Sequence, residues 1–149
     1  MNVLLSGITP NPKAFDLPGD TWIPAEVAAE KGVSATATLR RLDNSSWWLT
    51  GRLQMTFVLS CDRCACQVLW PVDDEFHYRL VAADEVADGE VDEKSLDLWP
   101  LFGPMLNLAE VFCERVFLAM PEKVLCAEEC RGLCPLCGAD LNREPCRCS

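Results

Sequence analysis

The sequence predicts an α+β fold, in which a small antiparallel β-sheet or partial barrel packs on one helix and continues into a cysteine-rich C-terminal tail. Three observations predict it. Apolar and polar residues alternate through most of residues 33–80, an apolar segment over 108–119 follows a capping residue, and six of the ten cysteines lie after residue 125. The chain has 149 residues, 50% of them apolar, which suits one ordinary domain with a buried core.

The first 32 residues are predicted to hold little regular structure. Val3 to Leu5 can form a short strand. Residues 10–24 contain four prolines and are therefore expected to form an irregular arm. Glu26 to Lys31 is expected to form one helical turn that ends at Gly32.

Three strands are predicted to follow. Alternation over residues 33–40 and again over 49–59, with turn-forming residues at 43–46 between them, is typical of a hairpin with one apolar face. A third strand is expected over 67–80, where Pro71 marks a sheet edge or a kink. These three segments make up the predicted sheet.

One helix is predicted after the strands. Asn107 can cap its N-terminus, Glu110 lies three residues further on, and Pro121 stops it. Because Glu110 and Glu114 form the only polar stripe, we expect this helix to be mostly buried. The sheet and this helix form a predicted body over residues 1–121.

Acidic residues outnumber basic ones, and most of the imbalance lies in one segment. The chain has 23 acidic and 13 basic residues, for a net charge of −10, and residues 73–97 alone contribute −8. That segment is expected to be a solvated loop, or alternatively a lure for a basic partner. The overall charge argues against bulk binding of nucleic-acid phosphates. Without a basic, apolar signal in residues 1–10 or a run of about 18 apolar residues, we expect a cytoplasmic protein with no membrane contact.

The spacing of the cysteines carries the strongest chemical signal. In a reducing cytosol, clustered cysteines more often hold metal than form disulfides. Cys134 and Cys137 are separated by two residues and followed by Gly138, a knuckle in which two sulfurs can point at one ion. Tetrahedral zinc takes four thiolates, so eight paired cysteines predict two structural zinc ions. The predicted ligands are Cys61, Cys64, Cys126, Cys130, Cys134, Cys137, Cys146 and Cys148.

Two pairings of these cysteines are open. In the favoured pairing, one ion takes the four cysteines of a short local loop, which are Cys134, Cys137, Cys146 and Cys148. The other ion takes Cys61, Cys64, Cys126 and Cys130 and pins a zinc-binding tail, residues 122–149, onto the body. The rival pairing joins Cys61 and Cys64 with Cys134 and Cys137, and spacing alone does not exclude it.

Other cysteine chemistry is less well supported. Disulfides require an oxidising compartment. A redox-active Cys-x2-Cys pair normally begins a helix, whereas Cys61 follows a predicted strand and Pro135 lies inside the other pair. Four cysteines also suit an iron–sulfur cluster, although the knuckle favours zinc. A zinc ion closed by four thiolates has no open position, so we expect no catalytic metal and no enzyme activity.

Several residues that are reactive or aromatic in other contexts have plainer interpretations. His77, the single histidine, falls on the polar phase of its strand and is expected to face solvent. Cys113 is expected to be a core thiol of the helix, and Cys66 a strand residue that is able to exchange as a ligand. Adjacent Trp47 and Trp48 must point to opposite faces if they lie in a strand.

The chain resembles a known family. Gly51-x-Leu53 leading into Cys61-x2-Cys64, the helix that ends in Leu118-Ala119-Met120-Pro121, and the tail Cys130-Arg131-Gly132-Leu133-Cys134-Pro135-Leu136-Cys137-Gly138 with Cys146-Arg147-Cys148 are similar to the YceD family of large ribosomal RNA subunit accumulation proteins. The resemblance covers residues 33–149, with an unusual Leu98 to Pro104 and an extra Cys66. It implies a cytoplasmic bacterial protein that supports accumulation or processing of large-subunit ribosomal RNA, with no established enzyme activity.

The charge refines what the resemblance implies. We expect a non-enzymatic zinc-binding factor of ribosome biogenesis that holds a basic ribosomal protein or large-subunit assembly factor, with the sheet face and residues 73–97 as the contact. Direct contact with ribosomal RNA is disfavoured by charge. One alternative is a zinc-ribbon RNA-binding protein that uses Arg131, Arg143 and Arg147; another is a thiol-disulfide oxidoreductase that uses Cys61 and Cys64.

Overall fold

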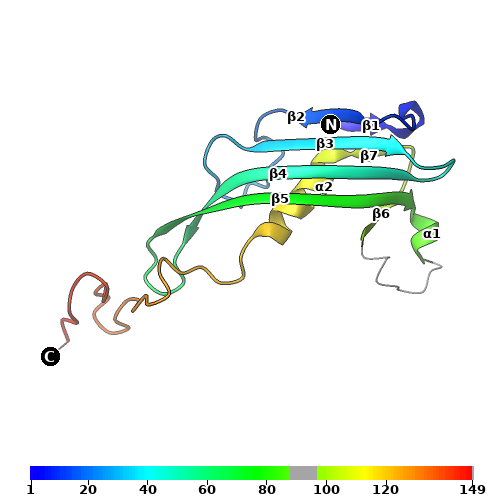
Figure 1. Cartoon of the computed structure of the whole chain (residues 1–149). Helices are drawn as coiled ribbons and strands as arrows, with labels where there is room; N and C mark the ends of the chain where they lie inside the picture. The colour runs from blue at the N-terminus through cyan, green and yellow to red at the C-terminus, as the bar shows by residue number, and fades with distance from the viewer. Residues whose placement is uncertain (88–96, 149) are drawn as a thin grey trace.

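A five-stranded sheet with one long helix on its inner face makes up most of the molecule (Figure 1). The computed structural model describes residues 1–87 and 97–148. The sheet strands lie in the order β2 (Lys13–Leu17), β3 (Ser34–Arg41), β4 (Trp47–Ser60), β5 (Gln67–Ala82) and β6 (Leu98–Leu101). All neighbours are antiparallel except β5 and β6, so the fold is α+β with a mostly antiparallel open sheet, as predicted.

The remaining elements are short. β1 (Asn2–Leu4) pairs with β7 (Met105–Asn107) in a separate two-stranded sheet, and a 3-10 turn, η1 (Leu5–Gly7), follows β1. Helix α1 (Ala83–Ala87) continues from the end of β5. Helix α2 (Leu108–Ala119) begins at Asn107, whose side chain accepts a hydrogen bond from the backbone N–H of Ala109, which confirms the predicted cap.

The core lies between the sheet and α2. Alternate residues of β3, β4 and β5 face the helix, and the ring of Phe76 lies over Gly51, where an added Cβ would collide with it. At the margin of this core, Arg115 of α2 makes a two-pronged ion pair with Asp74 at 2.8 and 2.9 Å and stacks over the Phe76 ring. Buried and exposed residues alternate in the second half of β5, which confirms the predicted pattern of that strand.

Several predictions about the first part of the chain were wrong. The arm of residues 10–24 contains β2, an edge strand paired with β3. The strand forms because Lys13–Leu17, between Pro12 and Pro18, contains no proline and can pair along its whole length. Residues 26–31 form no helical turn. Instead, the backbone of this segment forms hydrogen bonds with β4 beyond the point where β3 ends, and Ala29 forms a β-bridge with Phe57. Pairing with the sheet therefore satisfies backbone N–H and C=O groups that a helical turn would otherwise bond.

Two strands after the acidic segment were missed. β6 pairs in parallel with only the last four residues of β5, and it contains Pro100.

The helix α2 is less buried than expected, because Phe117 is 47% exposed and Leu118 is 62% exposed. The central part of the predicted acidic loop, residues 88–96, lies outside the described residues. Among the described helices, none is long and apolar enough to cross a membrane.

Candidate metal centres

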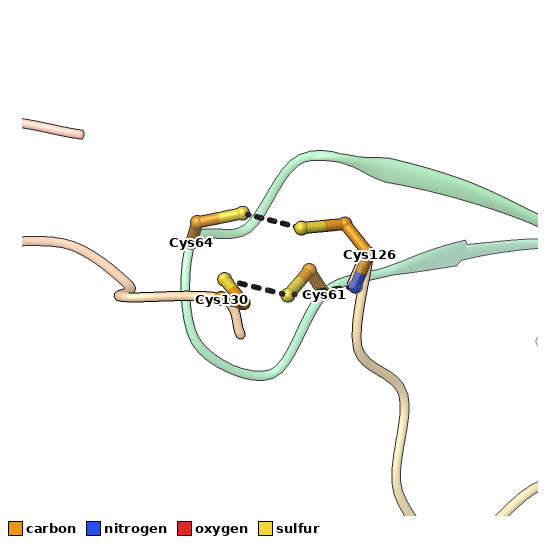
Figure 2. A group of neighbouring side chains, drawn as sticks. All are labelled: Cys61, Cys64, Cys126 and Cys130. Atoms are coloured by element: carbon orange, nitrogen blue, oxygen red, sulfur yellow. Dashed lines mark hydrogen bonds between the residues drawn. The ribbon is translucent and has the colours of Figure 1, made fainter. Parts of the chain in front are cut away.

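Four cysteines meet where the β4–β5 turn touches the segment after α2 (Figure 2). Their sulfurs all lie within 4.8 Å of one another, with Sγ–Sγ distances of 3.7 Å for Cys61–Cys130 and 3.6 Å for Cys64–Cys126. Only Cys126 is exposed. We call this group the inner centre. In a tetrahedral zinc site with thiolate bonds of about 2.3 Å, neighbouring sulfurs lie about 3.8 Å apart, so the spacing suits one such ion.

A second group of four lies in the tail. Its sulfurs are also within 4.8 Å of one another, and the Sγ–Sγ distances from Cys134 are 3.4 Å to Cys146 and 3.7 Å to Cys148. Cys137 lies 3.9 Å from Cys146. Cys134 is buried, whereas the other three are exposed. We call this group the outer centre.

Both centres are built on the same backbone knuckle. In the inner centre, Cys61 N–H donates to Cys66 O at 2.8 Å and Ala65 N–H donates to Cys61 O at 2.9 Å. In the outer centre, Cys134 makes the equivalent bonds with Ala139 and Gly138, both at 2.9 Å.

The residue after the second cysteine of each knuckle has a positive φ. Gly138 has a φ of 74° and takes this conformation freely, whereas Ala65 has a φ of 61° and carries a Cβ. The inner knuckle therefore holds backbone strain that the outer one avoids.

The knuckle backbone acidifies the cysteines that it carries. The pKa of Cys61 falls from 9.0 to about 6, first because the Cys64 backbone N–H donates to its sulfur. The pKa of Cys134 falls to about 6 for the same reason, with Cys137 as the first donor. The pKa values of Cys64 and Cys137 are also lowered by backbone N–H groups that donate to their sulfurs. These backbone hydrogen bonds therefore favour the thiolate form, which is the form that binds metal.

The pKa values of Cys126 and Cys146 shift in the opposite direction. A hydrogen bond from its own thiol to the Cys64 sulfur is the main reason why the pKa of Cys126 is raised. The pKa of Cys146 reaches about 11: the Cys148 backbone N–H lowers it, but the sulfurs of Cys134 and Cys148 outweigh that effect. Four thiolates at such distances repel one another unless a cation lies between them. The donor set thus fits a soft or borderline cation such as zinc.

The tail is attached to the inner knuckle by polar contacts as well as by cysteines. The Arg63 guanidinium donates to Cys130 O at 2.9 Å, and Leu133 N–H donates back to Arg63 O at 3.1 Å. Asp62 and Val124 exchange two bonds of 2.8 Å. Between Cys130 and Leu133, Gly132 has a φ of 77°, and a Cβ there would lie 3.0 Å from Arg63 O. The tail therefore fits closely against the knuckle.

The spatial grouping of the eight cysteines matches the favoured sequence pairing. Cys61 and Cys64 group with Cys126 and Cys130, and the rival pairing with Cys134 and Cys137 is not the one that the structure brings together. Two four-cysteine groups can therefore hold metal ions. That these eight residues are ligands stays a prediction, as does the division of the chain into a body and a tail domain.

The comparison with protein families agrees with this arrangement. The family described as Large ribosomal RNA subunit accumulation protein YceD matches residues 49–149, a span that includes most of β4, all of α2 and all eight predicted ligands. The chain belongs to the YceD family. The family is named for the accumulation of the large ribosomal RNA subunit.

Curated relatives of this YceD chain are distant. Uncharacterized proteins of Mycobacterium bovis and of two strains of Mycobacterium tuberculosis are each 26% identical to it over 141 residues. The alignment covers 88% of this chain and 65% of each relative, so the chain spans less than two-thirds of their length. No solved structure matches it.

The remaining singled-out residues lie outside the two YceD cysteine groups. Cys66 contacts the inner centre, with its Sγ 3.2 Å from that of Cys64, and Cys113 is half-buried and donates a hydrogen bond from its thiol to Trp22 O. As predicted, the ring of His77 is exposed, and Trp47 and Trp48 point to opposite faces of the sheet. Trp48 stacks on His77, whereas the Trp47 indole N–H donates to Leu5 O. Sequence reasoning missed the positive φ of Ala65, because no glycine marks it.

Proposed function

We propose that this protein is a non-enzymatic, zinc-stabilised factor that supports accumulation of large-subunit ribosomal RNA in the cytoplasm. The family match over residues 49–149 is the observation that carries this proposal. The partner that it holds is a basic ribosomal protein or a large-subunit assembly factor. The two cysteine centres serve to shape the molecule that makes this contact.

The structural role of zinc rests on the donor sets. Each centre offers four sulfurs to one ion, which leaves no coordination position for a substrate or an activated water. The backbone N–H groups that lower the pKa of Cys61 and Cys134 also favour the thiolate state that zinc requires. Zinc bound in this way contributes folding free energy to the tail rather than reaction chemistry.

Charge supports a basic protein partner over naked RNA. The chain carries −10 at pH 7, and each closed four-thiolate zinc site adds about −2. In the tail, Arg143 lies 3.5 Å from Asp140 and Arg147 lies 2.9 Å from Glu144. Two of the three arginines of the RNA-binding alternative therefore face carboxylates of their own segment, which weakens a basic face.

A depletion and rescue experiment tests the ribosomal role. Cells depleted of the protein are expected to lose mature large-subunit ribosomal RNA relative to small-subunit RNA, and the wild-type chain restores the ratio. A Cys61→Ser/Cys130→Ser variant restores it poorly, whereas Cys113→Ser, which changes a thiol outside both centres, restores it fully. An unchanged RNA ratio on depletion would contradict the proposal.

A binding experiment tests the kind of partner. The zinc-loaded chain is incubated with purified large-subunit ribosomal proteins and, separately, with protein-free large-subunit ribosomal RNA. We expect a salt-sensitive complex with one or more of the basic proteins and only weak binding to RNA. Tight, salt-sensitive binding to RNA alone would favour the zinc-ribbon alternative instead.

A further inference from the structure

One edge of the sheet is open over most of β5. β4 pairs with β5 from Gln67 to Leu80, but β6 pairs only with residues 79–82. Among the described residues, the stretch over 67–78 thus has a strand on one side only. An unpaired edge presents backbone N–H and C=O groups that can template an added strand.

A groove of about 340 Å³ runs along this edge. Four consecutive residues of β5, Glu75 to Tyr78, line one wall. Consecutive residues point to alternate faces of a sheet, so they can line one groove together only at the strand's edge. Leu98 and the α2 residues Glu114, Arg115 and Leu118 line the other side. The groove therefore offers a strand edge and a helix surface to the same occupant.

The charge of the groove is negative. Glu75, Asp97 and Glu114 are exposed along it. The one arginine, Arg115, is already held by Asp74 in the two-pronged ion pair. Glu75 also lies 3.7 Å from Arg52, and Asp97 lies 3.3 Å from His77. The three carboxylates still outnumber the one arginine of the groove, so the groove attracts a cationic occupant, and exposed Leu118 gives it an apolar contact.

We propose that this groove binds an extended, basic segment of a partner protein, which adds as a strand to the edge of β5 beside residues 72–78. This inference rests on the proposed function and places its partner. Successive side chains of the added strand alternate, so that one set faces α2 and the other set faces Glu75 and His77. Lysine or arginine side chains then reach Glu75 and Glu114, and an apolar one covers Leu118.

Two features limit the occupant. Pro71 has no N–H to offer, and a strand proline directs its nitrogen away from its paired neighbour, so the edge lacks a donor at that residue. The added strand is therefore confined to the stretch after Pro71. Residues 88–96 of this chain contain four acids and one base, so like charge disfavours them as the occupant.

Peptide binding to the full zinc-loaded chain tests the mode of recognition. The probe is a synthetic peptide of alternating lysine and valine, with an alternating glutamate and valine peptide as its control. We expect the basic peptide to slow hydrogen exchange of edge-facing amides over residues 72–78 at least tenfold, and the acidic peptide to leave them unchanged. Edge amides that are already protected in the free chain, or protection elsewhere only, would overturn the proposal.

Charge reversal tests the acidic rim. A Glu75→Lys/Glu114→Lys variant is expected to bind the basic peptide at least tenfold more weakly. The matched control, Glu128→Lys/Glu129→Lys, makes the same change in net charge at two exposed tail residues outside the groove and is expected to bind normally. Equal weakening by both variants would reduce the effect to bulk charge and overturn the proposal. Unchanged zinc content verifies that each variant is folded.

The same variants separate this inference from the proposed function. If a basic ribosomal protein binds the wild-type chain and the groove variant equally, the proposed function stands and the groove is the wrong site. If no ribosomal protein binds the wild-type chain, the proposed partner fails. Loss of binding in the groove variant but not in the tail variant supports both.

Discussion

The inner knuckle joins the two longest strands of the sheet, whereas the outer knuckle lies in a tail whose one described ladder contact is a bridge between Leu133 and Asp140. The two share backbone hydrogen bonds and cysteine spacing. They differ in surroundings, since three cysteines of the inner centre are buried and three of the outer centre are exposed. The same local chemistry thus fastens the tail to the body in one place and orders the tail itself in the other.

Removing an inner ligand is predicted to have the largest effect. In Cys130→Ser, metal affinity of the inner centre should fall more than about 100-fold, because changes to mere supporting groups already cost 10–100-fold. The tail should then become cleavable after Lys123 by trypsin. Cys146→Ser should lose the outer metal but keep the tail junction protected. Native mass spectrometry and limited proteolysis measure both, and equal protection in the two variants would remove the distinction between the centres.

Acid is predicted to affect the two centres alike. Cys61 and Cys134 both have a pKa of about 6, lowered from 9.0, so the stability that their thiolates contribute is full above pH 9 and is lost as the pH falls toward 6. Bound metal keeps the thiolates deprotonated further, so both ions should leave only below about pH 6. Metal content measured after titration checks this. Release from one centre at least two pH units above the other would show that thiol acidity differs between them.

Tightening the junction at Gly132 is predicted to loosen the tail. Gly132→Ala places a Cβ 3.0 Å from Arg63 O at a φ of 77°, which should cost about 1–2 kcal/mol of tail stability. Gly103→Ala is the control, because its Cβ would meet nothing within 4 Å. Hydrogen exchange at the Leu133 amide reports the change. Matching exchange rates in the two variants would mean that the tail does not pack on the knuckle as described.

Competition with a chelator is predicted to separate the centres by exposure. A zinc-binding dye should strip the outer ion about tenfold faster, because three of its four sulfurs are open to solvent. Absorbance of the dye should rise in two phases of equal amplitude, and only the faster phase should be absent in Cys146→Ser. A single phase that carries both ions would contradict the contrast.

Relieving the strain at Ala65 is predicted to have the smallest effect. Ala65→Gly should stabilise the inner centre by about 0.5–1 kcal/mol, since the glycine takes a φ of 61° without a Cβ clash but has more freedom when unfolded. Gly138→Ala in the outer knuckle, at a φ of 74°, should destabilise its own centre. Metal affinities measured by competition titration show whether each variant binds more tightly or more weakly than the wild-type chain. A loss of affinity in Ala65→Gly would show that Ala65 is not strained.

The elements of the fold with strong sequence periodicity could be predicted from the sequence. β3, β4 and β5 alternate over eight or more residues, and α2 has a capping residue and a proline stop. β2 has five residues between two prolines and β6 has four residues that include Pro100, so their pairing comes from the sheet rather than from local pattern. The cysteine grouping was predictable because local spacing favours a short loop. The fit of Gly132 against Arg63 was not, because it joins segments far apart in the sequence.

Native mass spectrometry of the full chain, purified without chelator and without oxidant, tests the central claim most directly. We predict a mass that corresponds to two zinc ions per chain with all ten cysteines reduced, and a loss of one ion in Cys130→Ser and of the other in Cys146→Ser. A metal-free chain with mass deficits from paired disulfides would contradict it, because the eight sulfurs would then form bonds with one another instead of holding metal.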